Sequence, residues 1–353
     1  MALTEPWKED CKCHGSFSES DLKRIEGTAS CAISILSSFF DHTGISAPNT
    51  APYGDRAVRS SRYREGSFRQ YVVPGDVSRR GARRGDWVHR ELTSRRSSAR
   101  ILADKSMVVT TEYADIALSG YTMRTFVAAP KAEGKYPGIW CYSDIFQLTP
   151  PLVRTCVRLA GYGFGVAAPE IYCRIEPPGT VIPFDDAGRT RGQQDAAKTP
   201  VADFDADCRA GLNWLSKNPR VALGKIGAIG FCIGGHLAFR AAFQPEVRAA
   251  ACYYGTGIHD GKLGRDADAG SLARAKEIRG DLLMIFGTND PHVPDAGRET
   301  IDGVLRSSGI RYKTLLYPAE HAFTRDEGPR YDPEATDEAF AETIRLFRRT
   351  FSA

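Results

Sequence analysis

One short stretch, Gly-Phe-Cys-Ile-Gly-Gly at residues 230–235, constrains the fold of this chain more than any other. The apolar run 226–229 before it predicts a buried strand, and residues 237–243 after it predict a helix. A cysteine held on a sharp turn between a strand and a helix is typical of a nucleophile elbow, in which the glycines permit a strained, closely packed backbone. The helix N-terminus behind the Cys232 sulfur favours the thiolate. The alternative interpretation is a buried, inert cysteine in a Gly-rich turn.

Two further candidate catalytic residues each follow a predicted strand. Asp290 lies in the loop after the apolar run 282–286, and His321 lies just after residues 312–317. Because the carboxyl ends of parallel strands meet at one edge of a sheet, both side chains are expected to converge there with Cys232. His321 would carry the proton, and Asp290 would fix the tautomer of His321 and stabilise the imidazolium. Taken singly, either residue could be an ordinary loop residue, but the ordered triple favours catalysis.

The other apolar segments predict an α/β fold over residues 107–353, with a mostly parallel sheet and helices on both of its faces. Further strands are expected at 121–128, 137–142, 164–168 and 247–254, and further helices at 150–161, 201–217, 296–307 and 336–350. Residues 173–200 are rich in Pro, Gly and Asp, and they predict a long loop over the site.

These motifs resemble those of the dienelactone hydrolase family, also called carboxymethylenebutenolidases, a branch of the α/β-hydrolases. Besides residues 230–235, the resemblance is carried by Gly-Thr-Asn-Asp-Pro at 287–291, His-Ala-Phe-Thr-Arg at 321–325, and segments 143–146 and 168–172. The resemblance implies a cysteine nucleophile at Cys232 and no metal or organic cofactor. It also implies a small, negatively charged lactone as the substrate, which is opened through a thioester.

The resemblance extends to residues that would stabilise charge during the reaction. The backbone N–H groups of Ile233 and Ile145 would hold the developing oxyanion, as acyl transfer requires. Asp144 stands where the family has a glutamate that takes part in activating the thiol. Its side chain is one methylene shorter, which leaves that contact in question, and a cap or turn role is the alternative.

Arginines are the implied ligands of the substrate carboxylate. Arg325, four residues after His321, matches one of the family's arginines in position. Arg189 and Arg191 lie in the region where a second one is expected, without a clear register. A guanidinium suits the role because its fork holds a carboxylate with two hydrogen bonds. The alternative for each arginine is a solvated surface charge.

Two histidines and a set of aromatic residues have simpler expected roles. His236, on the helix after the elbow, is expected to be a packed or capping side chain. His292 lies only two residues from Asp290, which makes it a poor candidate for the base. Several aromatic residues near strand ends could line a pocket, although core packing is the commoner role of such residues. They are Trp140, Tyr142, Phe146, Tyr172, Tyr253 and Tyr254.

Charge is unevenly distributed along the chain. Residues 1–106 contain 18 Lys and Arg against 13 Asp and Glu, so they carry a net charge of +5, whereas residues 107–353 carry −1. The C-terminal part therefore lacks the basic character of a nucleic-acid binder. Arg and Ser recur through residues 51–100 without a sustained hydrophobic period, which predicts a disordered or loosely ordered segment.

Three interpretations of residues 1–106 remain open. The segment could be a flexible tail without a catalytic role, or an arginine-rich arm that contacts a partner or a nucleic acid. The third and favoured interpretation is that translation starts at Met107. A chain of 247 residues beginning there would lead directly into the first strands of the hydrolase-like part.

Cysteine usage and hydropathy indicate the compartment. The nine cysteines are odd in number and scattered, which is not a disulfide framework, and a thiol nucleophile requires a reducing compartment. The motif Cys-Lys-Cys-His at 11–14 lacks a second Cys/His pair at zinc-site spacing, so no metal site is expected. The apolar run 31–40 is too short to span a bilayer and lies too far along for a secretory signal. We expect a cytoplasmic monomer or small homo-oligomer that does not bind membranes.

The sequence favours one function over two others. The favoured function is cysteine-dependent hydrolysis of a small, carboxylate-bearing lactone, as in the conversion of a dienelactone to maleylacetate. The second is a broader carboxylesterase or thioesterase, or a hydrolase of another lactone. The third is a redox-sensing protein that uses Cys232 as a reactive thiol without turnover.

Overall fold

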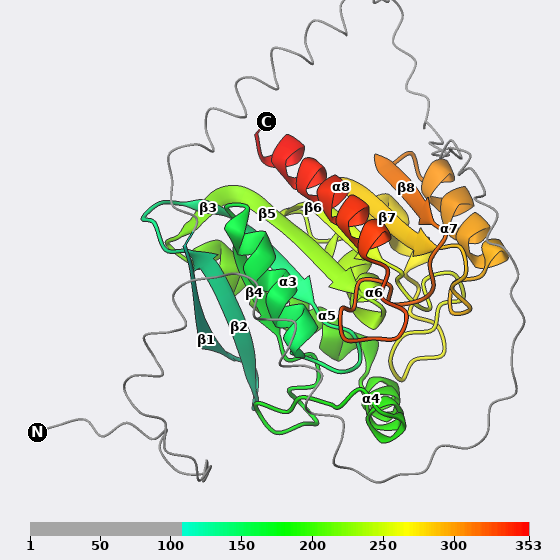
Figure 1. Ribbon diagram of the computed structural model, residues 1–353, viewed down its shortest axis with the longest axis horizontal. Coiled ribbons are helices and arrows are strands. Elements are labelled where there is room, and N and C mark those ends of the chain that lie inside the picture. Colours follow the sequence, from blue (N-terminus) through cyan, green and yellow to red (C-terminus); the bar gives the residue numbers. More distant parts are fainter. Residues whose placement is uncertain (1–107, 353) are drawn as a thin grey trace, which may run out of the picture. The chain divides into compact units, whose positions relative to one another are not determined.

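The computed structural model describes residues 108–352, and these residues build one sheet with helices on both faces (Figure 1). The eight strands of the sheet are β1 (Val109–Ala117), β2 (Thr122–Pro130), β3 (Tyr136–Tyr142), β4 (Gly165–Pro169), β5 (Val221–Phe231), β6 (Val247–Tyr253), β7 (Asp281–Gly287) and β8 (Tyr312–Tyr317). The helices are α3 (Pro150–Gly161), α4 (Asp186–Lys198), α5 (Val201–Lys217), α6 (Ile233–Ala241), the short 3₁₀ helix η1 (Leu272–Glu277), α7 (Asp295–Ser307) and α8 (Pro333–Phe351).

The order of strands across the sheet is β1-β2-β4-β3-β5-β6-β7-β8. Strand β2 pairs antiparallel with both β1 and β4, and every other neighbouring pair is parallel. The prediction of a mostly parallel α/β sheet is therefore confirmed. Because β3, β5, β7 and β8 run the same way, the loops that follow them emerge at one edge of the sheet, and these loops carry the candidate site residues.

Each face of the sheet has its own hydrophobic core. Helices α3 and α8 cover the face toward the viewer in Figure 1, where Leu152 and Phe347 are buried in one cluster. Helices α5, α6 and α7 cover the opposite face, where Leu212 and Leu237 belong to a second cluster. The strands between the two cores are buried on both sides, as in Ile226–Phe231 at the end of β5. Because helices cover both faces of the sheet, the carboxyl ends of its strands are held in place, and the site lies at these ends.

Strongly periodic segments form where the sequence predicts them. Strand β8 and helices α3 and α5 have the predicted bounds, and the other predicted strands and helices have ends shifted by a few residues. Pro150 starts α3, as expected from the tolerance of proline in the first turn. Strand β1 carries almost no signal because most of its residues are exposed.

The prediction of a long loop over residues 173–200 is wrong in part, because α4 occupies Asp186–Lys198. This helix has no apolar stripe: its buried residues are two glycines and Asp195, so no helical period is visible in the sequence. The side chain of Asp185 caps the helix by accepting a hydrogen bond from the Gly188 N–H at 2.6 Å. Packing against the rest of the fold, rather than hydrophobic pattern, therefore decides this element.

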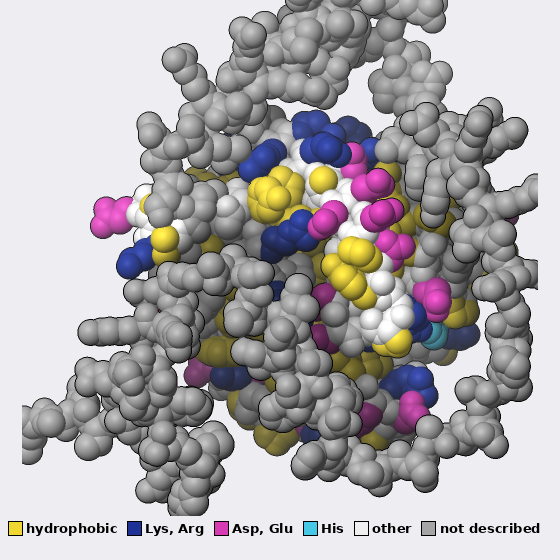
Figure 2. All heavy atoms as spheres, in the orientation of Figure 1, with side chains coloured by type: hydrophobic (Ala, Val, Ile, Leu, Met, Phe, Trp, Pro, Cys, Tyr) yellow, Lys and Arg dark blue, Asp and Glu magenta, His cyan; other side chains and the backbone are white. Residues whose placement is uncertain are grey.

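Opposite charges are interspersed on the face that carries α3 and α8 (Figure 2). Arg154 contacts Asp326 at 2.6 Å and Glu327 at 2.8 Å, and Arg158 contacts Asp337 at 2.9 Å. None of the helices within residues 108–352 combines the length and apolar character that crossing a bilayer demands. The expectations for residues 1–106, including the Cys-Lys-Cys-His motif at 11–14, fall outside the described residues.

Candidate active site

Cys232 lies between the end of β5 and the first turn of α6, and its backbone is strained. Its φ of 59° and ψ of −122° are unusual for any residue other than glycine. Both backbone polar groups are nonetheless held: the N–H donates to the Tyr253 carbonyl at 3.1 Å, and the carbonyl accepts from the Gly235 N–H at 2.9 Å. The thiol is partly exposed. Strain held in place by its surroundings is the expected signature of a nucleophile elbow.

The glycines around Cys232 are required by close backbone contacts. A Cβ on Gly230 would lie 1.9 Å from the Gly234 carbonyl oxygen, and a Cβ on Gly235 would lie 2.5 Å from the Tyr253 carbonyl oxygen. A Cβ on Gly234 would lie 2.2 Å from the Ser143 carbonyl oxygen. No side chain fits at these distances, so β5, α6 and the ends of β3 and β6 converge at the elbow because these positions are glycine.

His321 and Asp290 form a buried pair at the ends of β8 and β7. The His321 Nδ1 donates to Asp290 Oδ2 at 2.7 Å, and only 5% of His321 and 2% of Asp290 is exposed. Asp290 Oδ1 accepts a second hydrogen bond from the His292 N–H at 2.8 Å. Burial alone would raise the pKa of Asp290, but its hydrogen bonds and the charge of His321 hold that pKa below its usual value. Asp290 is therefore an ionised orienting group.

Cys232 and Asp290 both raise the pKa of His321. Burial by itself would lower this pKa, but the charge of Cys232, followed by the hydrogen bond that His321 donates to Asp290, raises it to about 9. The ring of Tyr254 packs edge-on against His321, with centroids 5.0 Å apart. The three predicted catalytic side chains are thus brought together at one edge of the sheet, where His321 bonds to Asp290 and is influenced by Cys232.

Arg298 on α7 fixes the loop that carries Asp290. Its guanidinium donates to the Gly287 carbonyl at 3.2 Å and to the Val293 carbonyl at 2.5 Å, and its side chain is 8% exposed. These two carbonyls stand at the two ends of the loop. One buried cation therefore ties both ends together and limits the movement of the carboxylate between them.

The segment after β3 packs against the first turn of α6. The close approach of Gly234 to the Ser143 carbonyl places this segment beside the elbow. Within residues 108–352, neither the Ile145 N–H nor the Ile233 N–H donates a hydrogen bond to a protein acceptor. Two unfilled donors from neighbouring segments are what an oxyanion hole requires.

Asp144 and Arg325 are paired with one another. Arg325 Nη2 lies 2.5 Å from Asp144 Oδ2, and the other carboxylate oxygen accepts the Phe146 N–H at 2.9 Å. The guanidinium packs against two rings, 4.9 Å from the Phe146 centroid and 4.5 Å from the Phe184 centroid. Its Nε–H is buried without an acceptor among the described residues. The site therefore holds a shielded cation with donor capacity to spare.

Known proteins share this architecture and sequence. The sequence profile of the Dienelactone hydrolase family matches residues 123–351, which is well over half of the chain. The chain belongs to the dienelactone hydrolase family. A Saccharomyces cerevisiae protein provisionally named as a carboxymethylenebutenolidase is 35% identical over 254 residues, covering 69% of this chain and 93% of that protein. The carboxymethylenebutenolidase of a Pseudomonas species is 28% identical over 218 residues, or 62% of this chain and 87% of its own.

Solved structures agree on the fold. A structure from Klebsiella pneumoniae, provisionally identified as a dienelactone hydrolase, superposes with a TM-score of 0.62 at 24% identity. The match covers 69% of this chain and 99% of that structure. The α/β-hydrolase fold and the assignment of the protein as a hydrolase enzyme, both predicted from the sequence, are confirmed.

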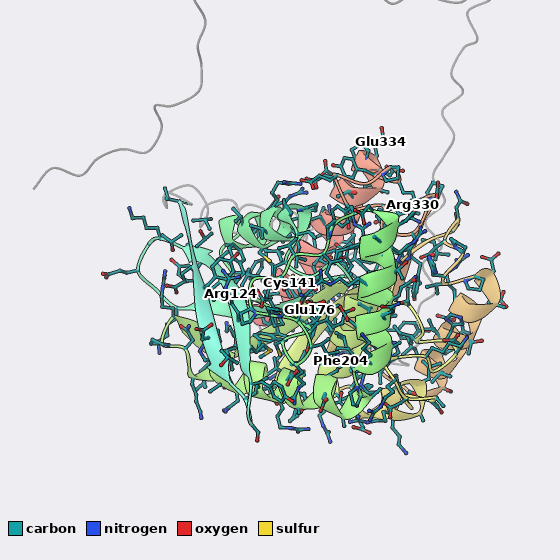
Figure 3. All side chains as sticks on the ribbon, turned by 90° about the horizontal axis from the view of Figure 1, so that it is seen from below. Arg124, Cys141, Glu176, Phe204, Arg330 and Glu334 are labelled. Atoms are coloured by element: carbon teal, nitrogen blue, oxygen red, sulfur yellow. The ribbon has the colours of Figure 1, made fainter. Side chains whose placement is uncertain are left out.

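In this dienelactone hydrolase, Arg189 and Arg191 are each paired with an acidic side chain, so neither is a free cation for a substrate carboxylate. Arg189 pairs with Asp186 at 2.9 Å and its side chain is 61% exposed. Arg191 pairs with Glu176 at 2.5 Å. Figure 3 looks onto this side of the molecule and shows Glu176 beside α4. Of the three candidate arginines, only Arg325 is both shielded and adjacent to the elbow.

The structure also places the two histidines and the aromatic residues that the sequence analysis named. His236 is a packed side chain with no exposed surface, and the six candidate aromatic residues are all buried. The ring of His292 lies 4.6 Å from that of His321, but its backbone N–H is what holds Asp290. Phe184 was missed by the sequence analysis, because it lies in the predicted loop, remote in the chain from its partner Arg325. Among residues 108–352, no three His, Cys, Asp or Glu side chains gather as a candidate metal site.

Proposed function

We propose that this hydrolase opens a small lactone that carries a carboxylate, by way of a thioester on Cys232. The observation that carries the proposal is the elbow, where Cys232 holds a φ of 59° beside the His321–Asp290 pair at 2.7 Å. Strain at a reactive side chain next to an oriented base indicates a nucleophile rather than a packed thiol. The carboxymethylenebutenolidases among the relatives support a lactone as the substrate class.

The reaction divides into acylation and hydrolysis. The Cys232 thiolate attacks the lactone carbonyl, and the N–H groups of Ile145 and Ile233 stabilise the resulting oxyanion. Collapse of this intermediate breaks the ring C–O bond, and the departing oxygen takes a proton from His321. Water, deprotonated by His321, then attacks the thioester, which releases the hydroxy or keto acid product and restores the thiol. Asp290 stabilises the imidazolium in both stages.

Arg325 is the proposed ligand of the substrate carboxylate. It is only 12% exposed, packs against the rings of Phe146 and Phe184, and retains a buried Nε–H without an acceptor within residues 108–352. Its present partner, Asp144, occupies one guanidinium nitrogen, so an arriving carboxylate would compete with Asp144 for the cation. Release of Asp144 would free its carboxylate to act on the Cys232 thiol, which is the activating role proposed for it.

A second candidate function is hydrolysis of neutral esters or thioesters. The pairing of Arg191 with Glu176 and of Arg189 with Asp186 favours it, because the second arginine expected for a carboxylate substrate is not free. Turnover of a carboxylate-bearing dienelactone beside its neutral methyl ester distinguishes the two functions. A strong preference for the carboxylate supports the lactone reaction, whereas indifference to it supports the neutral ester.

Replacement of the nucleophile tests the mechanism. Cys232→Ala is expected to lower kcat by at least about 10³-fold while the circular dichroism spectrum stays unchanged, since no other group takes over the covalent step. Cys173→Ala is the matched control, because Cys173 is the other partly exposed thiol within residues 108–352. Substantial turnover by Cys232→Ala would rule out the thioester route.

Replacement of Arg325 tests substrate recognition. Arg325→Ala is expected to raise KM for the carboxylate-bearing lactone by about 10- to 100-fold, the equivalent of one lost charge-assisted hydrogen bond. KM for the methyl ester should change little. Arg248→Ala serves as the control, because it removes an exposed charge at the start of β6, the end of the strand away from the site. Equal effects of Arg325→Ala on both substrates would eliminate its carboxylate-binding role.

A further inference from the structure

A chain of buried polar groups lies behind the elbow helix α6 and plays no part in the chemistry described above. Its central member is His236, which has no exposed surface, and next to it lie Ser271, 1% exposed, and Arg240, 5% exposed. Polar groups are buried at a cost unless each is hydrogen-bonded, so a network this deep is expected to have a definite arrangement.

In this network, each hydrogen bond can have only one donor and one acceptor. Arg240 is anchored to Asp205 at 2.9 and 2.6 Å and donates to Ser271 Oγ at 2.8 Å. The Ser271 hydroxyl is then free to donate to His236 Nε2 at 2.7 Å. The Thr256 carbonyl can only accept, so His236 Nδ1 donates to it at 2.9 Å. Burial lowers the pKa of His236 to about 3, which keeps one ring nitrogen a donor and the other an acceptor.

The network ends at the backbone of the nucleophile. The Thr256 N–H donates to the Cys232 carbonyl at 3.3 Å. The segment that carries Thr256 is also pressed against the first turn of α6, where a Cβ on Gly235 would lie 2.8 Å from the Gly255 Cα. The position of Thr256 therefore bears on the strained φ of Cys232, which persists only where its surroundings determine it.

We propose that His236 is a positioning residue for Cys232: by holding the Thr256 carbonyl, it fixes the backbone that supports the nucleophile elbow. This inference rests on the proposed role of Cys232 as the nucleophile. The imidazole suits the position because its two nitrogens lie on opposite sides of a rigid ring. It can therefore link the Thr256 segment to Ser271 and, through Arg240, to α5.

Substitutions at His236 separate positioning from simple packing. His236→Phe keeps a ring of similar shape without either nitrogen, whereas His236→Asn retains an amide that can donate to the Thr256 carbonyl in place of Nδ1. Ser271→Ala removes only the hydroxyl between His236 and Arg240, and it serves if His236→Phe does not fold. Leu305→Ala, on the buried side of α7, is the control for a loss of stability outside the network of His236.

The measurements are kcat and KM on the carboxylate-bearing lactone, the thermal midpoint, and the pH dependence of Cys232 alkylation by iodoacetamide, followed by mass spectrometry of its peptide. His236→Phe is expected to lower kcat by up to about 10²-fold with little change in KM, because a small misplacement of the sulfur is enough. The midpoint of alkylation should move to higher pH as the sulfur loses its alignment with His321. His236→Asn should recover most of both properties, and Ser271→Ala should show a smaller loss.

Two results would overturn the inference. One is that His236→Phe, or Ser271→Ala in its place, loses thermal stability as Leu305→Ala does but keeps wild-type kcat and alkylation. The other is that His236→Asn performs no better than His236→Phe. Substantial activity in Cys232→Ala would instead refute the proposed function, so the two failures are distinguishable.

Discussion

At the scale of the residue, the site requires a strained backbone at Cys232 and a buried His321 with a raised pKa. A positive φ at a residue other than glycine costs roughly 1–3 kcal/mol. Hydrogen bonds at both the N–H and the carbonyl of Cys232 offset this cost, each contributing about 1 kcal/mol. His321 is likewise kept buried with a pKa raised to about 9, which is favourable only while charged partners surround it.

The raised pKa of His321 predicts a loss of stability in alkaline solution. A folded-state pKa above the unfolded value of 6.5 means that protonation stabilises the fold fully below pH 6.5, and this contribution disappears as pH rises through about 9. The contribution is on the order of 3 kcal/mol at most, because the pKa rises from 6.5 to about 9 on folding. Urea unfolding of the wild type at pH 6 and at pH 10 measures it.

Cys232→Ala is the control for this pH dependence, because the charge of Cys232 is the largest of the causes that raise the His321 pKa. The variant should lose less free energy of unfolding than the wild type between the two pH values. An identical loss in both proteins would show that other groups, such as lysines and tyrosines, account for the whole effect.

At the scale of the element, the largely exposed helix α4 packs against the segment that carries Ile145. A Cβ on Gly192 of α4 would lie 2.4 Å from the Ile145 carbonyl oxygen, so this helix packs directly on the proposed oxyanion segment. Tyr172 adds a hydrogen bond from its hydroxyl to the Gly192 carbonyl at 3.1 Å. Movement of α4 would therefore displace a donor of the reaction.

Gly192→Ala should reveal this coupling. Alanine favours a helix by about 1 kcal/mol over glycine, but the clash with the Ile145 backbone is expected to cost about 1–3 kcal/mol and to lower kcat. Gly303→Ala is the matched control, because Gly303 lies in α7 with open space around its missing Cβ, so stability should rise by roughly 0.5–1 kcal/mol. Wild-type kcat in Gly192→Ala would mean that the two segments are not coupled.

At the scale of the whole molecule, both cores and every candidate site residue lie within residues 108–352. The parallel sheet between the two cores holds the ends of β3, β5, β7 and β8 in register, so the site has a rigid base. Residues 1–106 fall outside the part of the chain that the structure describes. The interpretations of that segment as a tail, a binding arm or an untranslated stretch remain hypotheses.

A chain of residues 107–353 is accordingly expected to fold and to hydrolyse the lactone with kcat close to that of the full chain. Circular dichroism and steady-state kinetics on both chains measure this, and Phe347→Ala provides the contrast within the core. Phe347 is fully buried in α8, and its removal should cost about 3–5 kcal/mol. A shortened chain that fails to fold would show that the first 106 residues are required for stability.

The sequence by itself determined the elements with a clear hydrophobic period and the order Cys232, Asp290, His321 after three strand ends. The local pattern is sufficient for these elements because the spacing of apolar residues over a short window shows which side of a strand or helix is buried. The same local pattern favoured an elbow over residues 230–235, and the structure shows the strained backbone there, with a φ of 59° at Cys232.

Only the tertiary structure decided which side chains meet across the fold. Arg325 and Asp144 are 181 positions apart in the chain, and His236 reaches Ser271 across 35. Helix α4 is equally invisible to pattern, since its buried residues are glycines and a carboxylate. Such contacts depend on the spatial convergence of distant segments and on charge pairing rather than on hydrophobic period, so no local reading of the chain contains them.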